Sequence, residues 1–288
     1  MLLSDPQIET ALEGLDPALI QELRSTLGDP AFSGRLEGAD ADNAAALLPL
    51  AAAFSVHPVS GIAVGAVAVG PSGKLYLGAN MEFPGMPLNA SLHAEQSALL
   101  NAWMHDENEV LALHVSETPC GHCRQFLREL SNIDRLDIVT KDGTHRLAEL
   151  LPHAFGEARA KGHGLLDSRP AELEAARPQA DTSMQRAINA ARRSYAPYSR
   201  SPEGFTLECL DGHFFSGRAA ESAAFNPSVP GVLVALNQRN LSGSRGVAIT
   251  AATQAKLATA VNNPLPFARA VLHSISKSKI GVVQMELR

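Results

Sequence analysis

The residues best suited to chemistry form two short motifs in the first half of the sequence. The first is Ser-Leu-His-Ala-Glu, which contains His93 and Glu95, and the second is Thr-Pro-Cys-Gly-His-Cys, which contains Cys120 and Cys123. One imidazole nitrogen and two thiolate sulfurs are three ligands that zinc prefers, and they leave a fourth tetrahedral position open. An open position is typical of a catalytic zinc. We therefore predict one Zn²⁺ per chain, bound by His93, Cys120 and Cys123.

Glu95 lies two residues after a predicted ligand and is not expected to coordinate the metal itself. A bound zinc ion lowers the pKa of water from about 15.7 toward 7. A carboxylate beside the open position can accept the proton that such water releases. Glu95 is therefore the predicted catalytic acid and base.

A structural zinc site is the main alternative for a Cys-x-x-Cys motif. It requires a fourth ligand, for which His122 is the obvious candidate. His122 stands between the two cysteines, where it is poorly placed to complete the same tetrahedron, and this alternative leaves Glu95 unexplained. A redox-active cysteine pair fits less well, because it requires neither the upstream histidine nor the glutamate.

The sequence around the motifs predicts an α/β fold. Apolar, β-branched residues at 62–69, the turn Gly70-Pro71-Ser72-Gly73 and residues 74–78 indicate a β-hairpin. A helix at 91–104, a strand at 111–116, a helix at 120–130 and a strand at 136–140 should follow. Helices are also expected before the hairpin, beginning at Asp5-Pro6 and Asp16-Pro17, with another at 44–54. This order points to a mixed sheet with helices on its faces.

The second half of the chain repeats turn and strand-end residues of the first at an offset of 139 positions. The repeated residues are Pro58 and Pro197, Gly65 and Gly204, Gly73 and Gly212, Gly78 and Gly217, and Glu82 and Glu221. At this offset His93 and Glu95 fall on Val232 and Val234, which can neither bind zinc nor move protons. We predict a helical segment (1–44), a catalytic domain (45–155), a linker (156–182) and a degenerate second copy without a metal site (183–288).

The motifs extend well beyond the predicted ligands. The whole chain resembles the large, two-domain form of cytidine deaminase found in bacteria and plants, on the segments Gly78–Phe83, His93–Ser97, Pro119–Phe126, Leu151–Gly156, Tyr195–Ser199 and Glu221–Pro227. His-x-Glu followed by Pro-Cys-x-x-Cys is the known signature of zinc nucleobase deaminases. The resemblance implies a duplicated α/β/α sandwich. It also implies hydrolytic deamination of cytidine and deoxycytidine to uridine and deoxyuridine.

The resemblance also implies roles for further residues. Asn80 and Glu82 would hold the ribose hydroxyls, and Met81, Ala94 and Phe155 would complete the substrate site. The family is homodimeric, with shared active sites. Ala224 and Phe225 would therefore line the active site of the partner subunit.

One residue departs from the family pattern. Ile62 stands where the family usually places a phenylalanine against the pyrimidine ring. An aromatic contact of this kind contributes about 0.5–1.5 kcal/mol beyond area burial. Its loss should weaken substrate binding without abolishing chemistry, and Phe155 is the candidate replacement.

Two competing functions remain open. One is deamination of another nucleotide or nucleobase, and the other is a catalytically inactive, zinc-stabilised scaffold that binds nucleosides. The net charge of −6 argues against a nucleic-acid partner, which requires a basic surface. The longest apolar run, 44–54, is too short to cross a membrane. Three cysteines, and an N-terminus without the features of a signal peptide, predict a cytoplasmic protein.

Overall fold

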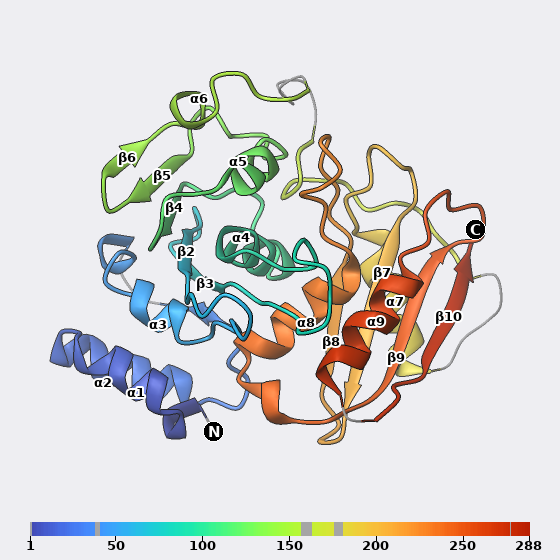
Figure 1. The fold of residues 1–288 in the computed structure, drawn as a ribbon, viewed down its shortest axis with the longest axis horizontal. Helices are drawn as coiled ribbons and strands as arrows, with labels where there is room; N and C mark the ends of the chain where they lie inside the picture. The colour runs from blue at the N-terminus through green and yellow to red at the C-terminus, as the bar shows by residue number, and fades with distance from the viewer. Residues whose placement is uncertain (1, 38–40, 157–162, 176–180, 277) are drawn as a thin grey trace.

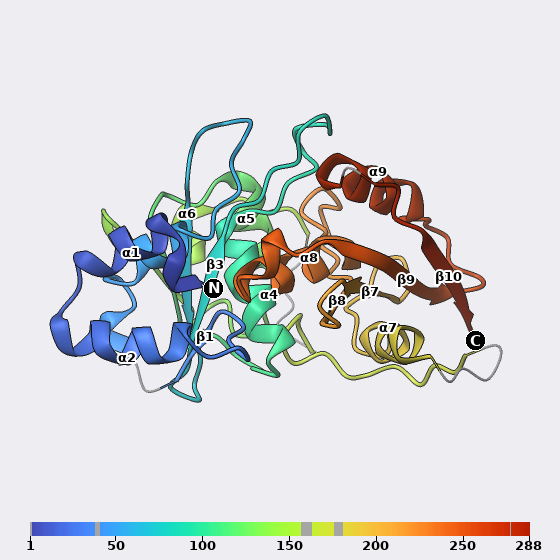
Figure 2. The ribbon, with the colours of Figure 1, turned by 90° about the horizontal axis from the view of Figure 1, so that it is seen from below.

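The computed structural model of the 288-residue chain describes residues 2–37, 41–156, 163–175, 181–276 and 278–288. It contains two β-sheets with helices on both faces of each. Two helices, α4 and α8, lie side by side between the sheets (Figures 1 and 2). The predicted α/β class is therefore correct. The predicted domain boundaries remain predictions, and residues 157–162 and 176–180 of the predicted linker lie outside the described residues.

The first sheet has the strand order β1-β3-β2-β4-β5-β6. Its strands are β1 (Arg35–Leu36), β2 (Gly65–Val69), β3 (Leu75–Ala79), β4 (Ala112–Val115), β5 (Asp137–Thr140) and β6 (Gly143–His145). β2 and β3 form the predicted hairpin, whereas β4 and β5 run parallel and are joined through a helix. The helices of this half are α1 (Pro6–Glu13), α2 (Pro17–Leu27), α3 (Leu48–Ala52), α4 (Ala94–Met104), α5 (Gly121–Leu127) and α6 (Leu147–Leu150).

Both faces of the first sheet are buried at β2 and β3, and alternate residues of β2 belong to different cores. Ala66 and Ala68 pack in the core that contains α4, whereas Val67 and Val69 pack in the core that contains α1, α2 and α3. Successive side chains of a strand point to opposite faces, so a sheet covered on both faces needs apolar residues throughout. The N-terminal helices thus supply the second cover of the sheet.

Sequence patterns located the N-terminal helices accurately. Asp5 and Asp16 cap α1 and α2 through their carboxylates, and proline follows each of them, as predicted. Other elements are shorter than predicted. The helix predicted at 44–54 is only α3, and the strand predicted at 62–69 begins at Gly65 because the Asn80 side chain binds the backbone of Ile62 and Val64.

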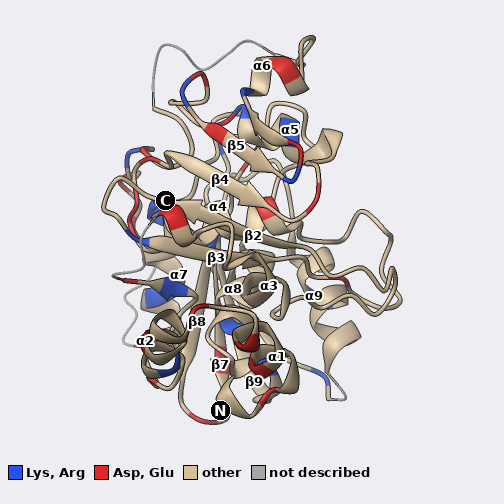
Figure 3. Cartoon of the chain, turned by 90° about the vertical axis from the view of Figure 1, so that its left-hand side faces the viewer, with Lys and Arg blue, Asp and Glu red and all other residues tan. Residues whose placement is uncertain are grey.

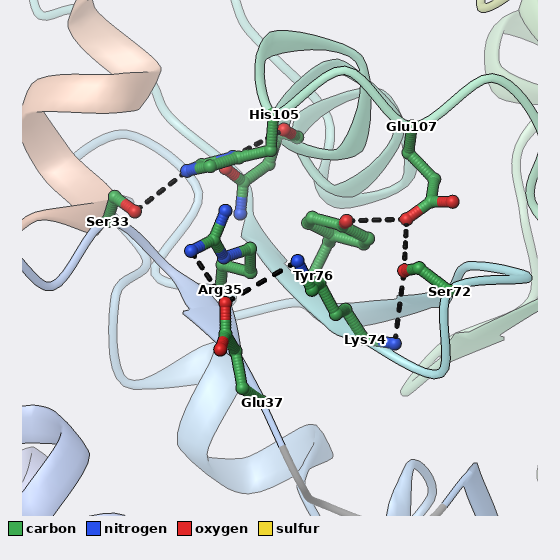
Figure 4. Close-up of polar contacts among 9 residues, drawn as sticks. Ser33, Arg35, Glu37, Ser72, Lys74, Tyr76, His105 and Glu107 are labelled. Carbon is green, nitrogen blue, oxygen red and sulfur yellow. Dashed lines mark hydrogen bonds and ion pairs between the residues drawn. The ribbon is translucent and has the colours of Figure 1, made fainter.

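The segment after α2 attaches to the edge of the sheet through polar contacts (Figure 4). β1 pairs antiparallel with β3, and Ser33 Oγ lies 2.7 Å from Nε2 of His105, at the end of α4. On the neighbouring strand, the Tyr76 hydroxyl donates to Glu107 at 2.6 Å. These contacts connect the N-terminal segment to both the sheet and the helix that carries Glu95.

The second sheet has the order β10-β9-β7-β8. Its elements are α7 (Thr182–Arg192), β7 (Glu203–Cys209), β8 (Phe214–Arg218), α8 (Gly231–Leu241), β9 (Ile249–Leu257), α9 (Leu265–Ile275) and β10 (Val282–Leu287). β7 and β8 form an antiparallel hairpin, and β9 pairs with β7 on one side and parallel with β10 on the other, which reproduces the arrangement of β3, β2, β4 and β5. α7 covers one face, and α8 and α9 cover the other (Figure 2).

Close backbone approaches show how the two halves correspond. A Cβ on Gly78 would lie 2.2 Å from the nitrogen of Ala98 in α4, and one on Gly217 would lie 2.3 Å from the nitrogen of Ala235 in α8. At these two positions only glycine lets a helix pack directly on the strand. Gly217 follows Gly78 by 139 positions, but Ala235 follows Ala98 by only 137.

This difference corrects the counterparts assigned from sequence. Two residues are missing before α8, so His93, the N-cap of α4, corresponds to Pro230, the N-cap of α8. Glu95 consequently corresponds to Val232. The assignment of Val232 and Val234 was wrong by two positions, because a constant offset cannot include a deletion. Proline and valine also lack metal-binding or acid–base groups.

We expect Gly78→Ala to destabilise the protein. The added methyl group would meet backbone atoms of α4, which cannot move without displacing the helix that begins after His93. Overpacking of this kind costs about 1–3 kcal/mol, and thermal unfolding should show a lower Tm. Gly14→Ala is the matched control, because nothing lies within 4 Å of the added Cβ there. Equal melting temperatures for the two variants would contradict the close packing.

Candidate active site

The three predicted ligands converge at the first turns of two helices. His93 is the N-cap of α4, Cys120 is the N-cap of α5, and Cys123 lies in the first turn of α5. Cys120 Sγ lies 3.4 Å from His93 Nδ1 and 3.7 Å from Cys123 Sγ. Together they form a group whose ligand atoms all lie within 4.8 Å of one another.

These separations fit a tetrahedral zinc ion. With Zn–S bonds of about 2.3 Å and Zn–N bonds of about 2.1 Å, tetrahedral geometry places two sulfurs about 3.8 Å apart and sulfur and nitrogen about 3.6 Å apart. The observed distances of 3.7 and 3.4 Å differ from these values by only a few tenths of an ångström. The donor set is also the one that zinc prefers, so the residues present fit the metal.

The two cysteine thiols lie in different electrostatic environments. A hydrogen bond from Cys123 is the largest of the effects that lower the pKa of Cys120 to about 3, with His93 contributing as well. Burial raises the pKa of the Cys123 thiol above its ordinary value. A contact with Cys120 raises the pKa of His93. The positive ends of the helix dipoles favour anionic ligands at both helix starts.

Glu95 lies in the first turn of α4 and is almost completely buried, with 5% of its surface exposed. Burial raises the pKa of this carboxyl. A raised pKa brings a carboxyl closer to neutral pH, where it can both accept and return a proton. Glu95 thus has the environment expected of a general acid and base.

His122 does not complete the ligand group. Its ring stacks on that of His93 with centroids 4.7 Å apart, and its Nε2 lies 3.3 Å from Oε1 of Gln96. These contacts orient His122 beside the site. Among the described residues, the only His, Cys, Asp or Glu group able to hold a metal comprises His93, Cys120 and Cys123. The structural-zinc alternative therefore lacks its fourth ligand.

A cavity of about 200 Å³ opens directly beside the ligand group. Its walls include six of the residues predicted for the site, namely Asn80, Glu82, His93, Ala94, Glu95 and Cys120. Sequence reasoning missed four polar residues that also line it, Ser60, Ser91, Glu117 and Thr118. Ser91 and Thr118 each precede a predicted zinc ligand by two residues. This closeness in the sequence could have indicated that they line the site.

Glu82 and Asn80 each form part of the loop that borders this cavity. Glu82 Oε2 accepts the backbone N–H groups of Val59 and Ser60 at 2.8 and 2.9 Å. Burial tends to raise the pKa of Glu82, but hydrogen bonds from Ser60 and Val59 outweigh it and lower the pKa overall. The amide oxygen of Asn80 accepts the backbone N–H of Val64, and its amide nitrogen donates to the carbonyl of Ile62. Both residues therefore shape the site whatever they contact in a substrate.

Two predicted substrate residues do not reach the cavity. Met81 is a core residue, 5% exposed, whose backbone pairs with Leu92. Phe155 exchanges hydrogen bonds with Gln125 through its backbone, and its side chain is 65% exposed to solvent. Ile62 does line the cavity, so an aliphatic side chain occupies the wall for which the family pattern predicts an aromatic ring.

Ala224 and Phe225 belong to a loop of the second half. Two residues of the first half hold this loop in place: Gln96 in α4 and Glu129 just after α5. Gln96 Nε2 donates to the carbonyl of Pro227 at 2.8 Å, and Glu129 Oε1 accepts the N–H of Ala223 at 2.8 Å. Phe225 has a left-handed backbone conformation (φ 61°) and is 72% exposed. Neither Ala224 nor Phe225 lines the cavity beside Glu95 in its own chain.

Charged side chains of both signs are distributed over both halves of the described structure (Figure 3). Lys and Arg are interspersed with Asp and Glu along the elements and form no basic stripe in the view of Figure 3. No helix among the described residues is both long and apolar enough to cross a bilayer.

Comparison with known proteins identifies the family. Residues 41–140 and 147–263 each match a model described as the cytidine and deoxycytidylate deaminase zinc-binding region. A cytidine deaminase from Aeromonas hydrophila is 48% identical over 69% of this chain and 68% of its own length. One from Cronobacter sakazakii is 43% identical over 83% of this chain and 85% of its own.

Among solved structures, cytidine deaminase from Mycobacterium tuberculosis matches 40% of this chain and 94% of its own, with 33% identity and a TM-score of 0.35. The assignment rests on the longer sequence matches and on the two matched zinc-binding regions. The chain belongs to the cytidine deaminase family, in the large form that contains two deaminase domains.

Proposed function

We propose that the protein catalyses the zinc-dependent hydrolytic deamination of cytidine and deoxycytidine. The observation that carries this proposal is a buried Glu95 directly beside a His93, Cys120 and Cys123 group of zinc-like geometry, at one open cavity. The names of the curated relatives support the same substrate. One nucleoside and one water would give uridine or deoxyuridine and ammonia.

The chain's own residues would move the protons. When bound, zinc lowers the pKa of water toward about 7 and so supplies a nucleophile at neutral pH. Glu95 takes up the proton that water releases and delivers it to N3 of the ring, which makes C4 electrophilic. After the water oxygen attacks C4, Glu95 takes the remaining proton from the new C4 hydroxyl and passes it to the amino nitrogen, and ammonia leaves as the C4–O double bond forms. Burial raises the pKa of the Glu95 carboxyl, which favours its protonation between the two transfers.

The cavity lining favours an uncharged nucleoside over a nucleotide. Glu82, Glu95 and Glu117 line it, whereas its walls contain neither lysine nor arginine. A 5′-phosphate requires cationic or N–H donors and would be repelled by these carboxylates. An inactive scaffold, the other alternative, has no use for a buried glutamate beside the metal ligands.

We further propose a homodimer in which Ala224 and Phe225 line the partner's active site. An exposed aromatic ring on a loop held by Gln96 and Glu129 supports this arrangement. Sedimentation velocity should give a dimer. Phe225→Ala should raise KM for cytidine, whereas a fully active monomer would refute the shared site.

The setting we propose is pyrimidine salvage in the cytoplasm. The reaction converts one pyrimidine nucleoside into another, and the thiolates of Cys120 and Cys123 must stay reduced to bind zinc. The three cysteines of the described structure are free thiols.

The direct test is the ultraviolet change that accompanies deamination. Zinc-loaded protein should convert cytidine and deoxycytidine, and should act much more slowly on cytosine, dCMP and adenosine. No conversion of either nucleoside would overturn the proposed function, and preferred conversion of dCMP would replace it with nucleotide deamination.

We expect Glu82→Gln to affect substrate binding more than chemistry. The variant retains an acceptor for the N–H groups of Val59 and Ser60 but loses the charge that would bind a ribose hydroxyl. A charged hydrogen bond contributes about 1.5–3 kcal/mol, so KM should rise about 10- to 100-fold with a smaller change in kcat. Steady-state kinetics with cytidine measure both values. The same substitution at Glu286, which is exposed on β10 in the second half, should leave KM unchanged.

A further inference from the structure

The second half of the chain contains a cavity of its own, of about 570 Å³. Its walls include the counterparts of several residues that line the cavity beside Glu95. The corresponding pairs are Ser60 and Ser199, Asn80 and Ala219, Glu82 and Glu221, Ser91 and Ser228, Leu92 and Val229, and His93 and Pro230. The backbone pairing of Met81 with Leu92 likewise recurs between Ala220 and Val229. The second cavity is therefore the structural counterpart of the candidate active site.

Part of the polar framework survives in this counterpart. Glu221 Oε2 accepts the backbone N–H groups of Tyr198 and Ser199 at 2.9 and 3.1 Å, as Glu82 does with Val59 and Ser60. Glu82 in the first cavity and Glu221 in the second are thus held by the same pair of backbone hydrogen bonds. Glu221 also supports the backbone at Tyr198 and Ser199, so this carboxylate alone does not indicate a ligand site.

The groups required for chemistry have been replaced by smaller or apolar ones. Ala219 stands in place of Asn80, Pro230 in place of His93 and, by the register of α8, Val232 in place of Glu95. These replacements remove metal binding and proton transfer. They also help to explain why the second cavity, at about 570 Å³, exceeds the 200 Å³ of the first. Its volume lies within the range of small-molecule sites.

A buried acid has been added to the wall of the second cavity. Glu203, which stands where the first half has Val64, is 4% exposed. Its Oε2 accepts the N–H of Gly231 at 3.0 Å, and its Oε1 accepts from Gln254 Nε2 at 2.7 Å. A carboxyl oxygen has two lone pairs, so each oxygen can accept one more hydrogen bond.

The chemistry of this wall indicates what it would recognise. The acceptor positions that remain on the Glu203 carboxyl suit a ligand that donates N–H groups. The exocyclic amino group of an aminopyrimidine is such a donor. Val229 and Pro230 add apolar surface suited to a flat ring, and Glu221 can accept sugar hydroxyls.

We propose that this second cavity is a non-catalytic binding site for an aminopyrimidine nucleoside, formed by Glu203, Glu221, Val229 and Pro230. The inference rests on the proposed nucleoside specificity of the first cavity, because the two share one architecture. The chain would then bind two nucleosides and convert only one of them.

Isothermal titration of cytidine into the zinc-loaded Glu95→Gln variant tests the proposal, since this variant should not consume the ligand. We expect two molecules bound per chain. Adding Ala219→Leu, which fills the cavity, should reduce the number to one. Val261→Trp, at an exposed position of the cavity wall, provides a second block that does not depend on repacking buried residues. Val283→Trp, exposed on β10, is the control for an added ring and should leave two.

A single bound cytidine in the zinc-loaded Glu95→Gln protein would overturn the second site. Two molecules that persist in both blocked variants would also overturn it, because the extra ligand would then lie elsewhere. Turnover by the wild-type protein separates this inference from the proposed function. If the wild type deaminates cytidine and the variant binds only one, the inference alone fails.

Discussion

Replacing Glu95 by glutamine should reduce kcat for cytidine by about 10³-fold or more, because one carboxyl is expected to carry every proton of the reaction. The substitution preserves size and leaves the zinc ligands untouched. Zinc content should therefore stay at one per chain, and cytidine should still bind. Steady-state and single-turnover assays, together with metal analysis, separate loss of chemistry from loss of metal.

The matched control for this prediction is Glu117→Gln. Glu117 lines the same cavity and loses the same charge, but it is exposed to solvent and lies in the segment before Cys120. Its kcat should change less than tenfold. A Glu95→Gln enzyme with near wild-type kcat would require another proton carrier, and the mechanism would then be wrong.

Replacing Cys123 by alanine should abolish zinc binding and activity together. Cys123 is one of only three protein ligands, and its thiol is buried in the first turn of α5. Two remaining ligands cannot retain zinc against dilution, so metal analysis after gel filtration should give less than about a tenth of an ion per chain. Circular dichroism should remain close to that of the wild type, because the sheet and α4 are packed independently of the metal.

Cys209→Ala provides the control for thiol loss. Cys209 is equally buried but lies at the end of β7, in the half without a metal group. The Cys209→Ala variant should retain one zinc ion per chain and turn over cytidine at the wild-type rate. Two tightly bound ions in the wild type would contradict the single site, and one retained ion in the Cys123→Ala variant would contradict the ligand assignment.

The parts of this structure that sequence predicted well depend on short-range physics. Asp5 and Asp16 cap helices by accepting the N–H of the residue two positions later. The predicted zinc ligands lie at helix starts that their own sequence motifs indicate. Glycine repeats revealed the duplication because close backbone packing tolerates no other residue at Gly78 and Gly217.

The errors and omissions arise from contacts between distant segments. The register of α8 depends on a two-residue deletion that only its packing on β8 reveals. Met81 lies between Asn80 and Glu82. Because successive side chains of an extended segment point to opposite sides, the Met81 side chain lies in the core. Glu203 gave no signal in sequence, because its importance comes from Gly231 and Gln254, which are 28 and 51 residues away.

The pairing of α4 with α8 has a consequence for synthesis of the chain. Ser97 Oγ donates to Asn237 Oδ1 at 2.6 Å, and Asn237 Nδ2 donates back to the carbonyl of Ser97, both buried. Translation of the roughly 140 residues between the helices takes about 7–28 s at about 5–20 residues per second. During that interval the helix that carries Glu95 has an uncovered face. A nascent chain should therefore engage chaperones until α8 has left the ribosome, and the catalytic half should mature only when the metal-free half is made.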